Sequence, residues 1–203
     1  MRAKDLMTST VATVRPDTPA KEAARLLASY GYTALPVVNE NDDLLGIVTE
    51  ADLIHDRILP DPRALIDDGP RQPVQRPPAL VDAVMTTEVV TVEMTTDAVA
   101  IIRVMLDRHL RSLPVVDGDH LEGIVTRRDL LRTIARDDQD IARDVRNRLA
   151  NACRRPWTVE VIDGVVRLTT DGDDAEDRHI GTVIAAALPG VVDVHLVDAA
   201  EDR

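Results

Sequence analysis

The stretch that decides the fold is Gly46–Leu53, which reads GIVTEADL, and it occurs a second time as Gly123–Leu130, which reads GIVTRRDL. Each copy is preceded by the same four residues, Leu-Pro-Val-Val, at 35–38 and at 113–116. The offset between the copies is 78 residues and becomes 77 after a one-residue deletion in a turn. Matches at a constant offset indicate an internal repeat. The chain therefore contains one structural unit twice.

Each copy predicts the order strand, helix, strand, turn, strand, helix. In the first copy we expect a short strand over Val11–Val14 and a helix opening at Thr18-Pro19, because threonine caps helices and proline fits their first position. The apolar runs Leu35–Val38 and Leu45–Val48 predict two strands joined by a polar turn. A second helix is expected near Thr49. Because a unit of about 55 residues buries little surface alone, we expect the copies to pack together.

The composition disfavours several classes of protein. The 203 residues hold 36 acidic and 24 basic side chains, and this net charge of −12 disfavours binding to nucleic acid or to an anionic membrane. Cys153 is the only cysteine, so an intrachain disulfide is impossible and a cysteine-based zinc site is not expected. Met1–Asp5 does not begin a secretory signal, and no apolar run is long enough to cross a membrane. We therefore expect a cytoplasmic protein.

The repeated Thr-x-x-Asp is the part of the unit with chemical content. Thr49 with Asp52, and Thr126 with Asp129, have the spacing of a capping box, in which each residue bonds the backbone N–H of the other. The same geometry also suits a ligand, because a helix N-terminus attracts an anion and an aspartate accepts both hydroxyls of a ribose. The residues alone leave both interpretations open.

The two units resemble a pair of cystathionine-beta-synthase (CBS) domains over about residues 3–136. The resemblance rests on the doubled Leu-Pro-Val-Val, the doubled Gly-Ile-Val-Thr-x-x-Asp-Leu and the Met-Thr dipeptides at 7–8 and 85–86. It implies a mixed α+β or α/β fold, with two βαββα-type repeats packed as a pseudo-twofold pair. It also implies a non-catalytic module, often a homodimer, that binds AMP, ADP, ATP or adenosylmethionine and regulates a partner protein. No metal and no obligatory cofactor is implied.

The resemblance implies ligand-binding residues in both repeats. In such pairs the threonine and aspartate of Thr-x-x-Asp contact phosphate or ribose, and these roles fall on Thr49, Asp52, Thr126 and Asp129. The adenine pocket would be formed by Thr10-Val11 and Leu35-Pro36 in the first repeat, and by Glu88-Val89 and Leu113-Pro114 in the second.

The two sites are not expected to be equal. Arg127 and Arg128 follow the second threonine, whereas Glu50 and Ala51 follow the first. Guanidinium groups bind phosphate, so a phosphorylated nucleotide is expected to prefer the second site, unless both arginines lie in solvent. Family members that bind AMP and ATP often carry a basic residue two positions before the proline, where this chain has alanine and serine. A neutral adenosine compound, or no ligand, is the alternative.

Residues 137–203 predict a separate domain. Apolar residues at spacing four from Ile141 indicate a helix, and Asp163-Gly164 between alternating strands indicates a hairpin. A second helix and a last strand over Val191–Val197 complete an αββαβ order, which resembles a BON domain at Gly164, Leu168 and 190–194. BON domains are associated with phospholipid surfaces, but this segment has 15 acidic and 8 basic residues. We therefore interpret it as a protein-interaction or oligomerisation domain rather than a lipid-binding one.

The expected organisation is a first repeat over 1–58, a proline-rich linker over 59–79, a second repeat over 80–136 and the BON-like domain over 137–203. Three functions are compatible with it. The first is a sensor that binds an adenosine ligand and signals to an unknown partner protein. The second is a constitutive oligomerising scaffold, in which the Thr-x-x-Asp elements only cap helices. The third is a membrane-associated adaptor that acts through the C-terminal domain.

Overall fold

The structure is a computed structural model, and it describes residues 1–55, 77–153, 156–170 and 175–198. Of the expected linker over 59–79, only 77–79 fall within these ranges. The chain forms two compact units. One comprises residues 8–94 and 104–125, and the other comprises residues 1–7, 95–103 and 126–203. Both contain helices and strands, so the mixed class predicted from the sequence is confirmed.

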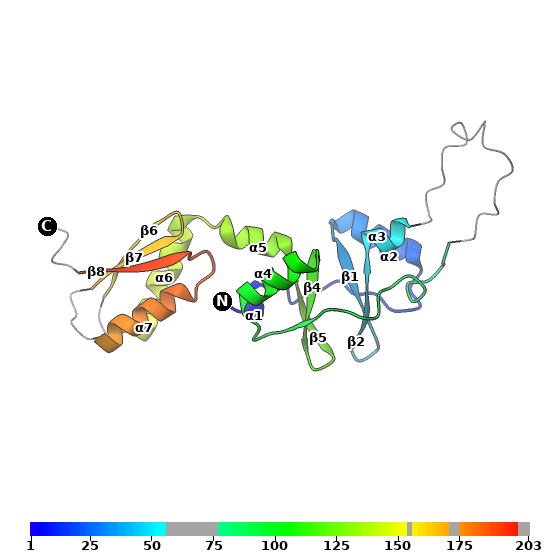
Figure 1. The fold of residues 1–203 in the computed structure, drawn as a ribbon, viewed down its shortest axis with the longest axis horizontal. Coiled ribbons are helices and arrows are strands. Elements are labelled where there is room, and N and C mark those ends of the chain that lie inside the picture. Colours follow the sequence, from blue (N-terminus) through cyan, green and yellow to red (C-terminus); the bar gives the residue numbers. More distant parts are fainter. Residues whose placement is uncertain (56–76, 154–155, 171–174, 199–203) are drawn as a thin grey trace, which may run out of the picture. The chain divides into compact units, whose positions relative to one another are not determined.

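Each part of the chain contributes one set of elements (Figure 1). The first repeat gives α1 (Ala3–Leu6), α2 (Ala20–Tyr30), β1 (Ala34–Val38), β2 (Leu44–Thr49) and α3 (Glu50–Ile54). The second gives β3 (Val92–Glu93), α4 (Ala98–Asp107), β4 (Ser112–Asp117), β5 (His120–Thr126) and α5 (Arg127–Ile134). The C-terminal segment gives α6 (Asp138–Ala152), β6 (Thr158–Ile162), β7 (Val165–Thr170), α7 (Ala175–Ala186) and β8 (Asp193–Asp198).

The first parallel pair is at the same position in both repeats. β1 and β2 are antiparallel, and β3, β4 and β5 form a sheet in that order. Val92 of β3 pairs in parallel with Val115, and the equivalent Val14 pairs in parallel with Val37. The strand expected over Val11–Val14 is therefore wrong except at its last residue, because Val14 alone bonds β1, through its N–H to Pro36 O and its carbonyl to the Val38 N–H.

The first long helix begins later than the sequence indicated. Pro19, not Thr18, is the N-cap of α2, and Ala20 is its first residue. The Thr18 hydroxyl does not cap the helix because it accepts the Arg15 N–H, at 2.9 Å, within the preceding turn. The helix ends at Gly31, whose φ of 65° is the left-handed conformation that glycine tolerates best.

The N-terminal segment of each repeat pairs with a strand of the other repeat. Thr8 exchanges two backbone hydrogen bonds with Ile124 of the second repeat, at 2.9 and 3.0 Å. The equivalent Thr86 exchanges two with Ile47 of the first repeat, both at 2.9 Å. The repeats are therefore connected reciprocally, because the N-terminal segment of each pairs with a strand of the other.

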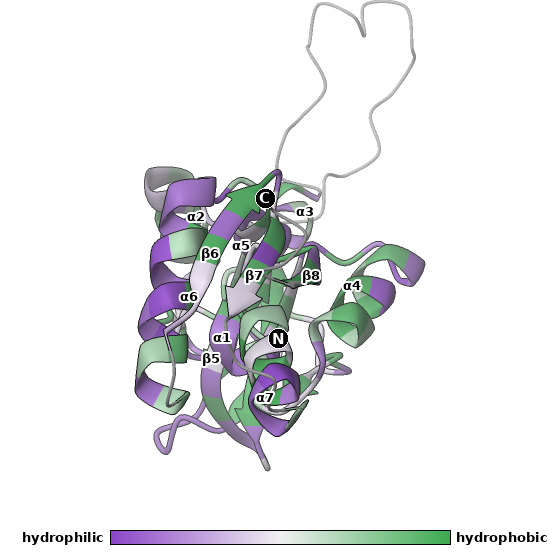
Figure 2. Cartoon of the chain, turned by 90° about the vertical axis from the view of Figure 1, so that its left-hand side faces the viewer, coloured by the Kyte–Doolittle hydropathy of each residue, from purple (hydrophilic) through white to green (hydrophobic). Residues whose placement is uncertain are grey.

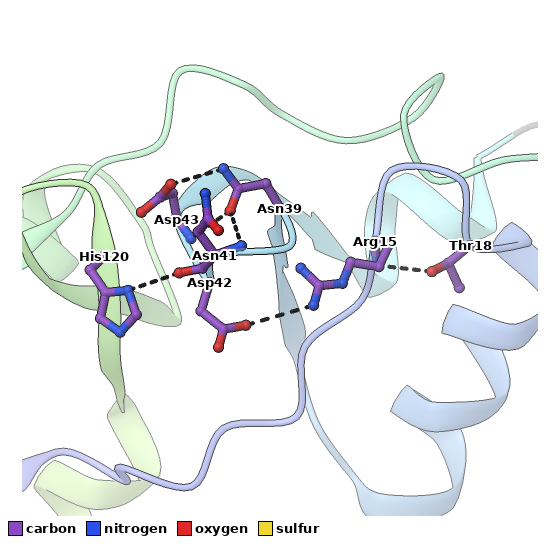
Figure 3. A network of polar contacts seen from close by, with 7 residues as sticks. All are labelled: Arg15, Thr18, Asn39, Asn41, Asp42, Asp43 and His120. Carbon is purple, nitrogen blue, oxygen red and sulfur yellow. Dashed lines mark hydrogen bonds and ion pairs between the residues drawn. The ribbon is translucent and has the colours of Figure 1, made fainter.

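The turns between the paired strands also meet. Asp43 forms an antiparallel bridge with His120, which occupies the equivalent position in the second repeat. The His120 ring also lies 3.1 Å from the carbonyl oxygen of Asn41 (Figure 3). The bonds on either side of the bridge are reciprocal, from Leu44 N–H to Asp119 O and from Leu121 N–H to Asp42 O. Two equivalent residues that pair with each other mark a local twofold axis.

Asn39 organises the turn of the first repeat. Its Oδ1 accepts the backbone N–H groups of Asn41 and Asp43, at 2.9 and 3.0 Å, and its Nδ2 donates to the Asp43 carboxylate (Figure 3). Asparagine favours such turns because its short side chain replaces a backbone partner. The polar turn predicted between the two strands is confirmed.

The C-terminal segment forms a three-stranded sheet in the order β6-β7-β8, antiparallel and then parallel. The predicted αββαβ order and the Asp163-Gly164 turn are confirmed; both turn residues have positive φ, 51° and 75°, as a two-residue hairpin needs. The last strand begins two residues later than expected, because the Val192 N–H bonds Gly164 O outside the ladder. The core includes Ile141, Val145 and Leu149 of α6, as their spacing predicted.

Candidate functional site

The first Thr-x-x-Asp joins the end of β2 to the start of α3. Both the Thr49 N–H and the Thr49 hydroxyl donate to Asp52 Oδ2, at 2.8 and 2.7 Å, and the Asp52 N–H donates back to the hydroxyl at 3.4 Å. The capping box is thus present. Asp52 is half-buried, and its second oxygen, Oδ1, accepts no hydrogen bond from the described residues. One carboxylate oxygen stays available to a ligand hydroxyl.

The second Thr-x-x-Asp has the same box in a different environment. The Thr126 N–H and hydroxyl donate to Asp129 Oδ2 at 2.9 and 2.6 Å, and the Asp129 N–H donates back at 3.3 Å. The Asp129 side chain is only 10% exposed, and its Oδ1 accepts Arg132 Nη1 at 3.3 Å. Both oxygens of Asp129 are therefore occupied, and a ribose at this site must displace Arg132.

A guanidinium from the second repeat lies beside the first box. Arg111 Nη1 is 3.8 Å from the carboxylate of Glu50, the residue directly after Thr49, and both side chains are largely exposed. The sequence interpretation missed Arg111 because it sought a basic residue two positions before Pro114, and this arginine stands three before it. The first site therefore also has an arginine nearby, Arg111.

The structure places the two arginines of the second site at the start of α5. Arg127 is half-buried and Arg128 is exposed, and they are the first two residues of the helix that follows Thr126. Their expected contact with a phosphate remains a prediction.

The expected adenine-pocket residues separate into buried and accessible sets. Leu35 and Leu113 are 0% exposed, and Pro36 and Pro114 are buried as well. These four residues belong to the buried parts of β1 and β4, and their role in an adenine pocket remains a prediction. Thr10 is exposed, and Val11 and Val89 are half-buried, so these three are accessible to a ligand.

The C-terminal segment, with the residue before it, carries a groove of about 530 Å³. Its walls are the outer face of α6, from Asp144 to Asn151, and Leu188-Pro189 of the loop after α7, with Arg136 at one end.

Cys153, directly after α6, is half-buried, and burial raises the pKa of its thiol. The Trp157 side chain lowers this pKa, and the negative charge of Asp177 raises it. Among the residues that the structure describes, no cluster of His, Cys, Asp and Glu could hold a metal ion. In the same ranges, no helix is long and apolar enough to cross a membrane.

Comparison with known proteins gives one consistent result. A family model described as the CBS domain matches residues 3–57 and 81–136. The protein MJ1404 of Methanocaldococcus jannaschii is 31% identical over 130 residues, which are 64% of this chain but only 31% of that protein. The solved structure of CBSX2 in complex with AMP is 30% identical, covers 64% of this chain and 93% of its own, and has a TM-score of 0.53. The CBS domain pair of MJ0100, in complex with 5′-methylthioadenosine and S-adenosyl-L-methionine, is 25% identical and has a TM-score of 0.51. The match covers 65% of this chain and 94% of that one.

Proposed function

The chain belongs to the CBS domain family, and we propose that it is a non-catalytic regulatory module that binds an adenosine-containing ligand and signals its presence to a partner protein. The observation that carries the proposal is the pair of Thr–Asp boxes, each at the junction of a strand and a helix. The two solved relatives contain AMP in one case and adenosylmethionine with methylthioadenosine in the other. We extend this ligand class to the present chain.

We propose different roles for the two boxes. At the first, the open Oδ1 of Asp52 accepts a ribose hydroxyl without displacing any group, and Thr49 lies next to it. At the second, the ribose competes with Arg132 for Asp129, a pair that contributes little because the arginine is 69% exposed. Arg127 and Arg128 then favour a phosphorylated ligand there. Adenosine is therefore expected to favour the first site and AMP the second.

Isothermal titration of the full chain with adenosine, AMP, ATP and adenosylmethionine tests this proposal. We expect Asp52→Ala to abolish the adenosine site, and Arg127→Ala with Arg128→Ala to weaken AMP while leaving adenosine unchanged. Asp107→Ala is the matched control, because Asp107 is an exposed acid at the end of α4. If no compound binds, the chain is better described as a constitutive scaffold.

Thermal unfolding gives an independent readout of the same binding. Ligand at 100 times its Kd stabilises the folded protein by about 2.7 kcal/mol, so occupancy raises the unfolding midpoint. The rise should disappear in the aspartate variant that removes the occupied site. A rise that persists in both aspartate variants would place the ligand elsewhere.

We also propose that the module is a homodimer that associates through α4. Figure 2 shows this helix as largely hydrophobic, and its outer side exposes Val99, Ile102 and Leu106 by 63, 37 and 56%. Apolar side chains at this spacing form one stripe on a helix. The equivalent positions of α2 hold Lys21, Ala24 and Ala28.

Light scattering after size exclusion tests the dimer. Leu106→Asp should yield monomers, whereas Ala28→Asp, an exposed change at the equivalent position of α2, should leave the assembly unchanged. Dimers of Leu106→Asp would exclude this helix as the interface.

For the remainder of the chain we propose the domain limits expected from the sequence, with a BON-like domain over 137–203 in a cytoplasmic protein. Its acidic balance favours a protein partner over a lipid surface. Co-sedimentation with anionic vesicles at physiological salt tests this preference. Binding that survives that salt concentration would identify a membrane-associated adaptor instead.

A further inference from the structure

The last helix of the second repeat continues into the C-terminal domain almost without a break. Helix α5 ends at Ile134 and α6 begins at Asp138, so residues 135–137 are the whole connection. Asp137 is fixed as well, because its side chain caps α6 by accepting the Gln139 N–H at 2.9 Å. Asp138 is held at the hairpin turn, where its carboxylate accepts the N–H groups of Asp163 and Gly164 at 2.8 and 2.9 Å. The connection is too short and too well bonded to act as a flexible linker.

Arg136 fastens this connection to two other parts of the domain. Its Nη1 donates to the carbonyl of Pro189 at 2.7 Å, and its Nη2 bonds the Asp144 carboxylate of α6. The side chain is 23% exposed. Because the planar guanidinium bonds two partners in fixed directions, Arg136 holds α6 and the loop between α7 and β8 in one arrangement.

Gly190 brings the same loop against α5 itself. A Cβ atom at this position would lie 3.2 Å from the carbonyl oxygen of Thr133 and 2.8 Å from Ile141 Cδ1. Thr133 belongs to the last turn of α5, and its hydroxyl donates to the carbonyl of Asp129 at 3.0 Å. The loop is thus packed between the end of α5 and the start of α6, and the bond from Thr133 to Asp129 lies within α5.

We infer that α5 and the C-terminal domain respond as one body, and that Arg136 is the positioning residue that couples them. Residues 126–203 lie in the same compact unit, so the box of the second repeat belongs to the unit that contains the C-terminal domain. The eight residues of α5 span about 12 Å between the box and the connection. The inference rests on the proposed function only in that a ligand at Thr126 and Asp129 starts the signal.

Hydrogen exchange of the full chain tests the coupling without any ligand. Asp129→Ala removes one half of the capping box, and we expect the protection of α5 amides to fall about fivefold. If α5 and the domain are coupled, the amides of α6 and β7 lose protection by a similar factor. In an Arg136→Ala background, we expect Asp129→Ala to lower the protection of the α5 amides only. Circular dichroism and Trp157 fluorescence check that each variant is folded.

Two further variants separate coupling from general destabilisation. Arg143→Ala breaks an exposed arginine–aspartate pair within α6 and should leave the effect of Asp129→Ala on the domain unchanged. Arg136→Lys keeps the charge but loses the fork, and should restore coupling only in part. If Asp129→Ala leaves the domain unaffected in the wild-type background, or affects it equally in both backgrounds, the inference is wrong.

A second arm adds AMP to the wild type and to Arg136→Ala. We expect AMP to protect α6 and β7 in the wild type only, with equal affinity for both proteins. Equal protection of the domain in both proteins would overturn the coupling role of Arg136. Absence of AMP binding would count against the proposed function, and the ligand-free comparison would still decide the coupling.

Discussion

Replacement of Gly190 by alanine should destabilise the C-terminal domain by about 3 kcal/mol. Gly190 has a φ of 89°, and a left-handed conformation costs an L-residue roughly 1–2 kcal/mol. The new methyl group would lie 2.8 Å from Ile141 Cδ1, a side chain that is 1% exposed, and overpacking of a filled core costs about 1–3 kcal/mol. The loss of unfolded-state entropy offsets about 0.4–1 kcal/mol of this sum.

Gly31 is the matched control for this substitution. Its φ of 65° is also left-handed, but no atom lies within 4 Å of the position that a Cβ would take. Gly31→Ala should therefore cost only about 1 kcal/mol, the backbone contribution alone.

Urea unfolding measures both variants. Trp157 packs against the core formed by residues of α6, β6, β7 and α7, so its fluorescence reports the unfolding of that region, and far-UV circular dichroism follows the whole chain. If Gly190→Ala costs no more than Gly31→Ala, the loop does not pack against Ile141 as described, and the reasoning about the junction fails.

Three further predictions concern packing, capping and the thiol. Leu149→Ala should lower the free energy of unfolding in urea by about 2–5 kcal/mol because Leu149 is 1% exposed. Leu131→Ala, at a residue that is 64% exposed, should change it by no more than about 0.5 kcal/mol. Similar losses of stability in the two variants would show that Leu149 is not a core residue. Thr49→Ala and Asp52→Ala should each cost about 1 kcal/mol in thermal unfolding, and the double variant should cost less than their sum because both remove the same box. Full additivity would show that the two side chains act independently. Burial raises the pKa of Cys153, so its reaction with a disulfide reagent at pH 8 should be slower than that of free cysteine and should accelerate as pH rises; an equal rate would indicate an open thiol.

The sequence predicted what short-range patterns can encode. The repeated apolar runs specified β1, β2 and their counterparts, because alternating and continuous apolar stretches reflect burial directly. The spacing of Thr49 and Asp52 predicted a capping box, and both halves of it are present in the structure. The same pattern in the second repeat forms the same bonds.

Contacts between distant segments were beyond the sequence patterns. Of the strand expected over Val11–Val14 only Val14 pairs with β1, and the preceding Thr8 pairs with Ile124 of the other repeat. The proximity of Arg111 to Glu50 likewise arises between repeats. The hydrogen bonds of Arg136 to the carbonyl of Pro189 and to Asp144 likewise join residues that lie apart in the sequence. Periodicity describes the faces of one element, and none of these contacts lies within one element.

The reciprocal pairing of the two N-terminal segments has a consequence for biosynthesis. Thr8 leaves the ribosome early but has no partner until Ile124 has been made, which at ordinary elongation rates takes on the order of 10 s. During that interval the first repeat presents an unpaired strand edge. Two chains translated close together on one messenger RNA expose the same edges. Pairing of an N-terminal segment with a neighbouring nascent chain therefore competes with its pairing within its own chain.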